Sequence, residues 1–289
     1  MTRIGVRDTF TGFVILAFLG VLVALGQPDT PQPAGFGDQL ESAAENRLDR
    51  IEHMAASGVK IIYSNGHGSG VLFVRGEEVY ILTAAHVIED RRGRRGPFGF
   101  LPQQLILDVV RLSRSYGTSS IWIQRHRQSV DVYTTDIYAA EVIAVNGHAD
   151  AAILRVKNVT PKNFPGLDGG AVFDLRNNKL LRKGMKTIHV GNFHNSIEAV
   201  TEGVIANPQQ PLKHGAGPLP DFRVIQVTNM IAPGSSGGGI YLEGNGKCIG
   251  IVVRTAWSPG DSLIIPAYQI DQWLNGVSDE MAVLLEQPE

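Results

Sequence analysis

The spacing of hydrophobic and polar positions changes along this chain and separates an N-terminal part from a long part rich in short apolar runs. From Val59 onward, runs rich in Val, Ile and Tyr alternate with turn residues, and helical patterns are absent between most of them. The first group of runs comprises 59–63, 71–74, 79–82, 121–124, 130–133 and 142–145. The second group comprises 187–190, 199–205, 224–228, 240–242, 248–254 and 263–265. This pattern predicts an all-β, antiparallel fold built from two groups of strands, and not an α/β sheet.

The two groups set the expected domain boundaries. We expect one domain over 58–275, with an N-terminal half at 58–157 and a C-terminal half at 185–266. The stretch between the halves contains Pro161, Pro165 and a Gly-rich run, which is typical of a connection between them. Residues 267–275 have the pattern of a short closing helix, and the tail at 276–289 has no clear pattern.

A strongly apolar stretch at 10–26 precedes these groups. Arg3 and Arg7 lie before it, and no further Lys or Arg occurs before Arg47, which favours residues 1–9 in the cytoplasm and the rest outside the membrane. Its apolar core of about 16 residues is intermediate between a signal h-region and a membrane span of roughly 20 residues. We expect an uncleaved single-pass anchor with a periplasmic or extracellular domain. Signal cleavage after Gly26, giving a secreted or periplasmic protein, is the alternative, and a buried core helix is disfavoured by the Pro-rich sequel.

An extended tether and a helix are expected next. Residues 27–37 contain several prolines, which favour a semi-rigid extended chain. Asp38 and Glu41 form a capping-box variant ahead of an amphipathic helix at 38–57, and Gly58 is a stop signal. The apolar positions at helical spacing are Leu40, Ala44, Leu48, Ile51 and Ala55. We expect this stripe to pack on the protein's own domain, with a helix that forms a homo-oligomer as the alternative.

The composition excludes several classes of function. The 289 residues carry a formal charge of −2, which argues against a polyanionic partner and therefore against nucleic-acid binding. The single cysteine, Cys248, rules out an internal disulfide and is expected in a buried strand. No His or Cys spacing is typical of a metal site, so we expect no metal and no cofactor. The Arg-rich run at 91–95 predicts a solvated loop, with contacts to anionic lipid headgroups or to an acidic substrate as alternatives.

The stretch Pro-Gly-Ser-Ser-Gly-Gly-Gly at 233–239 is the first candidate for chemistry. A serine hydroxyl such as that of Ser236 is a weak nucleophile, so it needs a neighbouring base and donors for the oxyanion that it creates. The glycines allow a tight turn in which the N–H groups of Gly234 and Ser236 point into one small space and form an oxyanion hole. Taken alone, however, such a motif more often marks a tight hairpin.

Two motifs upstream change this interpretation. His86 follows the apolar run Tyr-Ile-Leu-Thr-Ala-Ala, and Asp150 directly precedes the run Ala-Ala-Ile-Leu-Arg-Val. The order His86, Asp150, Ser236 is the chain order of the chymotrypsin fold and differs from the order in subtilisin and in α/β-hydrolases. Together the three motifs predict a catalytic triad.

With these residues the sequence resembles the trypsin-like serine proteases, and most closely their Deg-type (high-temperature-requirement) branch. The likeness extends over residues 58–273 and includes Gly-Ser-Gly-Val-Leu-Phe at 68–73 and further similar stretches at 189–207 and 246–255. Ser235 stands where the family has Asn or Asp, and Gly239 stands where it usually has Pro. The chain ends soon after the predicted domain, so we expect no C-terminal PDZ module of the kind that many Deg-type enzymes carry.

The resemblance implies a fold, an activity and roles for individual residues. The expected fold is two antiparallel β-barrels with the site in the cleft between them. The expected activity is a serine endopeptidase with His86 as general base, Asp150 as its orienting partner and Ser236 as nucleophile. A substrate strand is expected to pair with 251–254, which includes Ile251, Val252 and Val253.

The resemblance also places Met230 at the base of the primary specificity pocket, with Ile231 beside it. No Asp or Glu occurs between Asp221 and Glu243, so the pocket has no carboxylate to pair with a Lys or Arg side chain. We therefore expect cleavage of proteins or peptides after small or medium aliphatic residues. The alternative is a membrane-tethered, catalytically inactive binding module with the same fold, for which the two departures are the only support; an esterase is a weaker alternative.

Overall fold

The computed structural model describes residues 36–63, 66–88, 121–129, 132–147, 149–164, 170–176, 180–193, 199–214, 217–255, 262–278, 281 and 284–286. The chain divides into two compact units, 1–45 and 46–289. The expected cytoplasmic segment at 1–9, the anchor at 10–26, most of the tether and the Arg-rich run at 91–95 lie outside the described residues. None of the helices within the described residues is both long and apolar enough to span a membrane.

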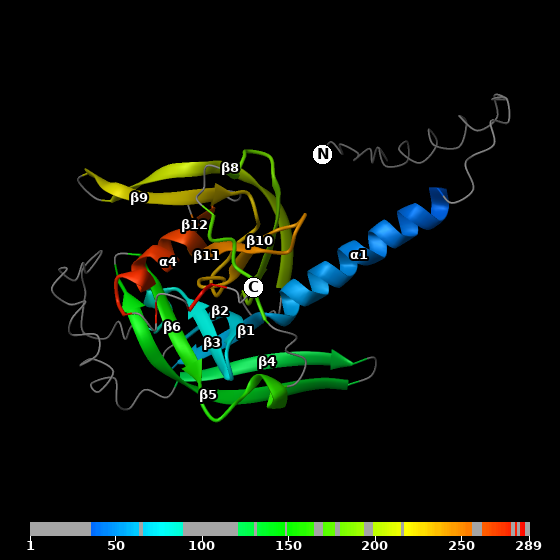
Figure 1. Ribbon diagram of the computed structural model, residues 1–289, viewed down its shortest axis with the longest axis horizontal. Helices are drawn as coiled ribbons and strands as arrows, with labels where there is room; N and C mark the ends of the chain where they lie inside the picture. Colours follow the sequence, from blue (N-terminus) through cyan, green and yellow to red (C-terminus); the bar gives the residue numbers. More distant parts are fainter. Residues whose placement is uncertain are drawn as a thin grey trace, which may run out of the picture. The chain divides into compact units, whose positions relative to one another are not determined.

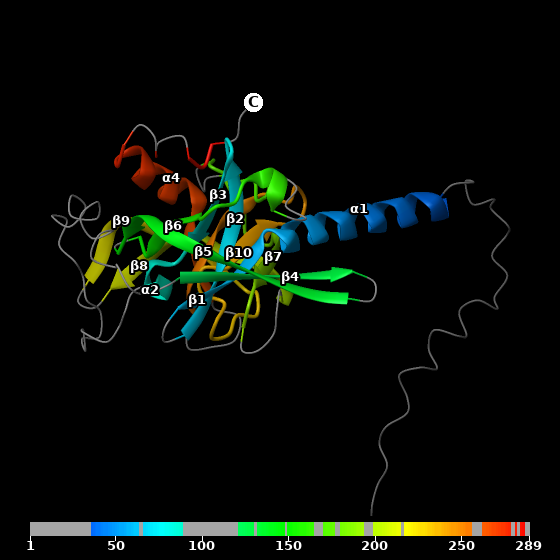
Figure 2. The ribbon, with the colours of Figure 1, turned by 90° about the horizontal axis from the view of Figure 1, so that it is seen from below.

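The first predicted group of strands forms a closed antiparallel barrel (Figure 1). Its strands are β1 (Gly58–Tyr63), β2 (Gly66–Arg75), β3 (Glu78–Thr83), β4 (Ile121–Ser129), β5 (Val132–Asn146) and β6 (Ala151–Val156). They are hydrogen-bonded in the order β1-β2-β3-β6-β5-β4. β4 and β5 pair along their whole shared length and run side by side in Figures 1 and 2. The three strands predicted between residues 121 and 145 are therefore parts of one long hairpin.

The second group forms another closed antiparallel barrel. Its strands are β7 (Lys186–Gly191), β8 (Ala199–His214), β9 (Gly217–Val227), β10 (Gly239–Leu242), β11 (Cys248–Thr255) and β12 (Ser262–Pro266), in the order β10-β11-β12-β9-β8-β7. β8 is longer than the predicted strand, which ended at residue 205. Its pairing with β9 shifts register at three places between Ile205 and Lys213, and these irregularities accommodate Pro208 and Pro211, which cannot donate a ladder hydrogen bond. The predicted all-β fold of two antiparallel barrels is confirmed.

Three clusters of buried apolar side chains form the cores inside and between the two barrels. One cluster fills the N-terminal barrel, with Ile61, Leu72 and Leu154 fully buried, and another fills the C-terminal barrel around Ile225 and Ile264. The third cluster contains residues of both barrels, among them Leu82, Ile153, Val190 and Ile251. Because this shared core excludes water between the barrels, it fixes how residues carried by one barrel face residues carried by the other.

The helices found in the described residues are separate from the strands of the barrels. They are α1 (Phe36–Ala56), α2 (Ala85–Ile88), the 3-10 turn η3 (Pro161–Asn163) and α4 (Ala267–Asn275), which packs on β11 and β12. In the last turns of α1, Met54 is buried and Ile51 and Ala55 are half-buried, but Leu48 is 57% exposed. The expectation that the whole stripe packs on the domain is therefore wrong at Ala44 and Leu48, which are exposed; the buried contacts of the helix come from its last turns, at Ile51, Met54 and Ala55.

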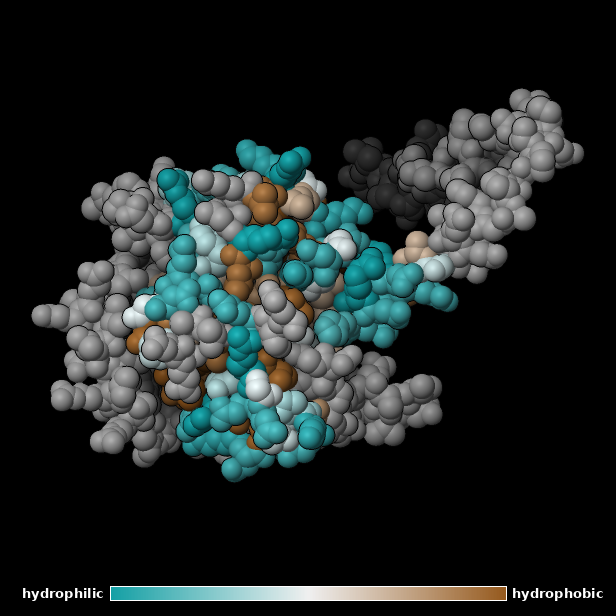
Figure 3. Space-filling model, in the orientation of Figure 1, coloured by the Kyte–Doolittle hydropathy of each residue, from teal (hydrophilic) through white to brown (hydrophobic). Residues whose placement is uncertain are grey.

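Among the described residues, large apolar side chains are exposed only in scattered places. On the face shown in Figure 3, apolar residues (brown) appear as separate patches among hydrophilic ones (teal). The exposed large apolar residues lie on different elements: Leu48, Ile137, Leu180, Met185, Val200, Met230 and Val277. Cys248 is fully buried in β11, as predicted, and burial raises the pKa of its thiol to about 12. This cysteine is therefore a packing residue and not a nucleophile.

Candidate active site

His86 and Asp150 are joined by two hydrogen bonds. The Asp150 Oδ2 atom lies 2.7 Å from His86 Nδ1, and the backbone N–H of His86 donates to Asp150 Oδ1 over 2.9 Å. Both carboxylate oxygens therefore hold the same residue, which fixes the imidazole ring and leaves its Nε2 for another partner. Asp150 has a φ of +47°, a left-handed conformation that Asp tolerates better than most residues.

The register of two strands brings this pair together. β3 and β6 are antiparallel, and Thr83 at the end of β3 lies opposite Ala152 at the start of β6. His86 follows Thr83 by three residues and Asp150 precedes Ala152 by two, so the two turns meet at the same edge of the barrel. Ala84 and Ala85 are buried against the barrel, which requires small side chains in the turn leading to His86.

The loop that carries Ser236 packs closely against the N-terminal barrel. Gly237 has a φ of +84°, and a Cβ at this position would lie 2.2 Å from both the carbonyl oxygen of Ser69 and the Oγ1 atom of Thr83. Only glycine fits this turn, because a side chain would meet rigid backbone in addition to needing a left-handed conformation. Its contact with Thr83 brings the loop to the end of β3, next to the turn that contains His86.

Ser69 on β2 holds the same loop by hydrogen bonds. Its backbone N–H donates to the carbonyl of Ser236 over 2.8 Å, and its hydroxyl donates to the carbonyl of Gly234 over 2.7 Å. The hydroxyl oxygen also accepts the N–H of Asn192 over 2.7 Å. The hydroxyl proton and an oxygen lone pair of Ser69 are thus both used to fix the backbone around the predicted nucleophile.

The predicted oxyanion donors lie in this fixed loop. Gly234 has a φ of +102°, and its Cα lies against the imidazole of His67, since a Cβ there would be 2.9 Å from His67 Nε2. Within the described residues, the N–H groups of Gly234 and Ser236 donate to no acceptor. No hydrogen bond joins the hydroxyl of Ser236 to His86 among these residues either. Such bonds are often long in unliganded enzymes and tighten when substrate binds.

The two departures from the family pattern have structural explanations. Ser235 is fully buried, and its hydroxyl accepts the N–H of Ala232 over 3.3 Å. This hydrogen bond stabilises the loop by joining two of its own residues. At Gly239, a Cβ would lie within 2.9 Å of three atoms of the Tyr241 side chain, two in the ring and the hydroxyl oxygen. The Tyr241 hydroxyl in turn lies 2.6 Å from the Ser57 hydroxyl at the end of α1. The ring of Tyr241 therefore occupies the space that a proline ring at residue 239 would need.

His189 on β7 lies beneath the loop and was not singled out from the sequence. It is fully buried, and burial lowers the pKa of its imidazole to about 4. A Cβ at Gly238 would lie 2.9 Å from His189 Nε2, so the neutral ring packs directly against the nucleophile loop. Ser69 and His189 show no local signal of this role, although each lies in one of the stretches that carry the family likeness, 68–73 and 189–207.

The structure constrains the residues predicted to bind substrate. Ile251 and Val252 are fully buried, and the backbone of Val252 is already hydrogen-bonded to Gly237 and Gly238. Since β11 also pairs with β12, neither residue has a free edge for a substrate strand. Val253 is half-buried and Arg254 exposed, so the edge open to a substrate begins at Val253.

Met230 is 65% exposed, whereas Ile231 is half-buried. The backbone before Met230 is anchored, because Asn229 is buried and its amide donates to the carbonyl of Thr201 over 2.9 Å. The carbonyl of Met230 itself accepts the Thr201 hydroxyl over 3.0 Å. Met230 thus has a fixed backbone and a side chain that is not enclosed, so its place at the base of a pocket stays a prediction. Among the described residues, no cluster of three or more His, Cys, Asp or Glu is arranged to hold a metal ion.

Comparisons with known proteins agree with this architecture. The family described as trypsin-like peptidase domain matches residues 68–251. Serine protease HTRA2, mitochondrial, of Bos taurus is 26% identical over 277 residues, which cover 91% of this chain and 50% of that protein. Serine protease HTRA1B of Danio rerio is 28% identical over 158 residues, or 55% of this chain and 31% of that protein. The chain thus spans half the length or less of these curated relatives. The crystal structure of Deg5 has a TM-score of 0.55 at 17% identity, covers 83% of this chain and 97% of Deg5, and shows the shared fold.

Proposed function

We propose that this chain, which belongs to the trypsin-like peptidase domain family, is a serine endopeptidase whose triad is His86, Asp150 and Ser236. The observation that carries the proposal is the pair of hydrogen bonds between His86 and Asp150, at 2.7 and 2.9 Å. This pair fixes the orientation of the His86 imidazole, and the loop that carries Ser236 is held against the end of β3, three residues before His86. The same arrangement of a base and its orienting carboxylate activates serine nucleophiles on unrelated folds.

Each residue of the triad has its own role in the proposed reaction. Ser236 Oγ attacks the carbonyl carbon of the scissile peptide while His86 Nε2 accepts the hydroxyl proton. His86 returns that proton to the nitrogen of the leaving amine, the C–N bond breaks, and an acyl-enzyme remains on Ser236. A water molecule, deprotonated by His86, then hydrolyses the ester. Asp150 keeps its negative charge throughout and stabilises the imidazolium.

The oxyanion is held by the N–H groups of Gly234 and Ser236. Their lack of an acceptor among the described residues supports this role. In other enzymes, the loss of one such donor raises the barrier by about 2.7–4 kcal/mol. Ser69 and the buried His189 preorganise the loop, so that little reorganisation is needed when charge develops.

For the substrate we propose a protein or peptide segment that adds a strand at the edge of β11 from Val253 onward, and that is cleaved after a small or medium aliphatic residue. The absence of any carboxylate between Asp221 and Glu243 supports this preference. Discrimination between aliphatic residues is modest, since one methylene in an apolar pocket changes binding by about 1–3 kcal/mol. We also propose that residues 10–26 tether the domain to the outer face of the cytoplasmic membrane.

A fluorophosphonate probe tests the chemistry directly. We expect it to label the full chain at one serine, and Ser236→Ala to abolish both labelling and peptide cleavage. Ser278→Ala, which removes an exposed hydroxyl outside the site, is the matched control and should behave like the parent. A parent chain that folds but takes no label would point instead to the inactive binding module.

A further inference from the structure

The end of α1 contacts the strand that follows the nucleophile loop. Ser57, directly after the last residue of the helix, is buried, and its hydroxyl lies 2.6 Å from the hydroxyl of Tyr241 on β10. Tyr241 is buried as well. β10 begins at Gly239, only three residues after Ser236. One buried side chain therefore connects the end of the helix with the strand that leads out of the nucleophile loop.

The side chain of Tyr241 lies over the start of β10. Gly239 and Tyr241 are two positions apart on a strand, so they share one face of it. A Cβ at Gly239 would lie 2.6 Å from Cε2, 2.9 Å from Cζ and 2.8 Å from the hydroxyl oxygen of Tyr241. The outer part of the ring and the hydroxyl therefore pack directly on the backbone of Gly239.

The hydrogen bond between the two hydroxyls has a defined direction. The hydroxyl of Ser57 donates its only proton to the carbonyl of Met54 in the last turn of α1, over 2.6 Å. The hydroxyl of Tyr241 must therefore donate to the oxygen of Ser57. Burial raises the pKa of Tyr241 well above its ordinary value, so this donor keeps its proton. Ser57 is thus an acceptor whose orientation is set by the helix.

Ser57 is itself held by both barrels. Its carbonyl accepts the N–H of Leu72 on β2 over 2.7 Å. The next residue, Gly58, lies against β7, since a Cβ there would be 2.6 Å from Val190 Cγ1. Because the backbone on either side of the Ser57 side chain is fixed, its hydroxyl is a rigid point of attachment for Tyr241.

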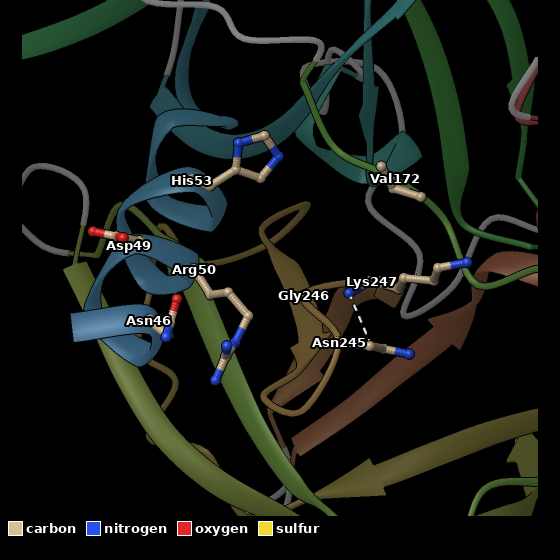
Figure 4. Close-up of a pocket in the computed structure, with 8 residues that line it drawn as sticks. All are labelled: Asn46, Asp49, Arg50, His53, Val172, Asn245, Gly246 and Lys247. Atoms are coloured by element: carbon tan, nitrogen blue, oxygen red, sulfur yellow. Dashed lines mark hydrogen bonds between the residues drawn. The ribbon is translucent and has the colours of Figure 1, made fainter. Parts of the chain in front are cut away.

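A second contact attaches the helix directly after the end of β10. Arg47 binds Glu243, the residue that follows β10, and also Glu202 on β8 over 2.6 Å. Beside this contact, a hollow of about 340 Å³ separates the helix from the turn that joins β10 to β11 (Figure 4). The helix is therefore attached to the two ends of β10 through polar contacts, by Ser57 near its start and by Arg47 after its end.

The nucleophile loop has little freedom where it meets β10. The N–H of Gly238 donates to the carbonyl of Ser235 over 2.8 Å, which closes the turn that contains Ser236. The carbonyl of Gly238 accepts the N–H of Val252 on β11 over 2.9 Å. Since Gly239 directly follows Gly238, a displacement of Gly239 changes both hydrogen bonds and with them the backbone around Ser236.

We propose that Tyr241 is a positioning residue for the nucleophile loop, and that Ser57 at the end of α1 holds it in place. The proposal rests on the proposed function, because it concerns the same nucleophile. Glycine has no side chain to restrict its backbone, so the ring of Tyr241 supplies this restriction at Gly239. The bond to Ser57 fixes the ring. Without it, the loop holds Ser236 and the oxyanion donors less exactly, which lowers kcat more than it changes KM.

Steady-state kinetics of Tyr241→Phe in the full chain test this role, because the substitution removes one hydroxyl and keeps the ring. We expect kcat on a peptide substrate to fall about fivefold or more, with KM within roughly twofold of the parent. Tyr80→Phe is the matched control, since it removes the hydroxyl of another buried tyrosine, one that bonds to Glu78 on β3. It should keep the parent kcat even if the protein is less stable. A folded Tyr241→Phe chain with the parent kcat would overturn the proposal.

Ser57→Ala and the double variant complete a mutant cycle. If both residues act through one bond, the double variant should have the kcat of Tyr241→Phe alone, within roughly twofold. Ser57→Ala leaves the buried Tyr241 proton without this acceptor, so adding Tyr241→Phe should restore part of the stability that Ser57→Ala loses. Losses of kcat that multiply in the double variant would mean that the residues act separately, against the proposal.

Amide hydrogen exchange, measured by mass spectrometry, tests the same inference without any activity. Peptides that cover the loop from Ser235 to Gly239 should exchange about threefold faster or more in Tyr241→Phe and in Ser57→Ala, and at the parent rate in Tyr80→Phe. Equal exchange of the loop in all four proteins would show that Tyr241 does not position it. A parent chain that takes no fluorophosphonate contradicts the proposed function alone, because exchange is measured whether or not Ser236 is a nucleophile.

Discussion

The hydroxyl of Ser69 in the N-terminal barrel donates a hydrogen bond to the carbonyl of Gly234 in the C-terminal barrel, 2.7 Å away. The carbonyl of Gly234 belongs to the loop that supplies both the proposed nucleophile and the proposed oxyanion donors. One side chain of the first barrel therefore sets the direction of a peptide group in the second. Ser235 supports the same loop from the other side of the turn, because it is fully buried and its hydroxyl accepts the N–H of Ala232.

We expect Ser69→Ala to lower kcat with a smaller change in KM. The substitution leaves the Gly234 carbonyl and the Asn192 N–H without this partner, which costs about 1–3 kcal/mol. If most of that loss appears in the transition state, kcat on a peptide substrate falls roughly tenfold to 100-fold. Steady-state kinetics and thermal unfolding should be measured together. A variant that loses stability but keeps its kcat would show that Ser69 is structural only.

Gly237→Ala should destroy the site, because its Cβ would lie 2.2 Å from two atoms of the N-terminal barrel and φ is +84°. We expect a loss of unfolding free energy of about 1–3 kcal/mol or more, together with loss of fluorophosphonate labelling. Gly244→Ala is the matched control, since a Cβ there meets nothing within 4 Å. Its unfolding free energy should stay within about 0.5 kcal/mol of the parent.

The unfolding free energy at acidic pH should depend on His189. Burial lowers the pKa of this imidazole from 6.5 to about 4, so the unfolded chain binds the proton more tightly than the folded chain. The contribution of neutral His189 to the unfolding free energy is complete above pH 6.5. It is lost progressively as the pH falls toward 4, by up to about 3 kcal/mol. Chemical denaturation of the parent and of His189→Leu between pH 4 and 7 measures the difference. A parallel pH dependence in both proteins would contradict this assignment.

Met230→Asp tests the specificity pocket. Because the Met230 side chain is 65% exposed, we expect the substitution to change the unfolding free energy by less than about 0.5 kcal/mol. If Met230 forms the pocket base, kcat/KM for aliphatic sites falls about tenfold or more, because the new carboxylate must be desolvated by the substrate. A peptide library analysed by mass spectrometry gives the cleavage profile. An unchanged profile would mean that Met230 does not contact the substrate.

The sequence by itself determined the fold class and the triad candidates. Short runs of Val, Ile and Tyr between turns predicted an all-β antiparallel fold with two groups of strands, and the resemblance to the trypsin-like proteases implied that each group forms a barrel. The motifs around His86, Asp150 and Ser236 are contiguous in sequence, so their residue types and their order could be read without a structure. Cys248 was placed correctly in a buried strand for the same reason, since its neighbours are apolar.

Only the tertiary structure decided how distant segments meet. The opposition of Thr83 and Ala152, the hydrogen bond from Ser69 to Gly234 and the packing of Tyr241 against Gly239 depend on strand register and on the core shared by the barrels. At Val252, one edge of β11 pairs with β12 and the other is hydrogen-bonded to Gly237 and Gly238. The part of β11 that we expect to pair with a substrate therefore begins at Val253 and not at Ile251. A hydrophobic pattern specifies which face of a strand is buried, but it does not specify which other strand covers that face. That choice follows from packing the whole chain at once, because each such contact joins residues that are far apart in the sequence.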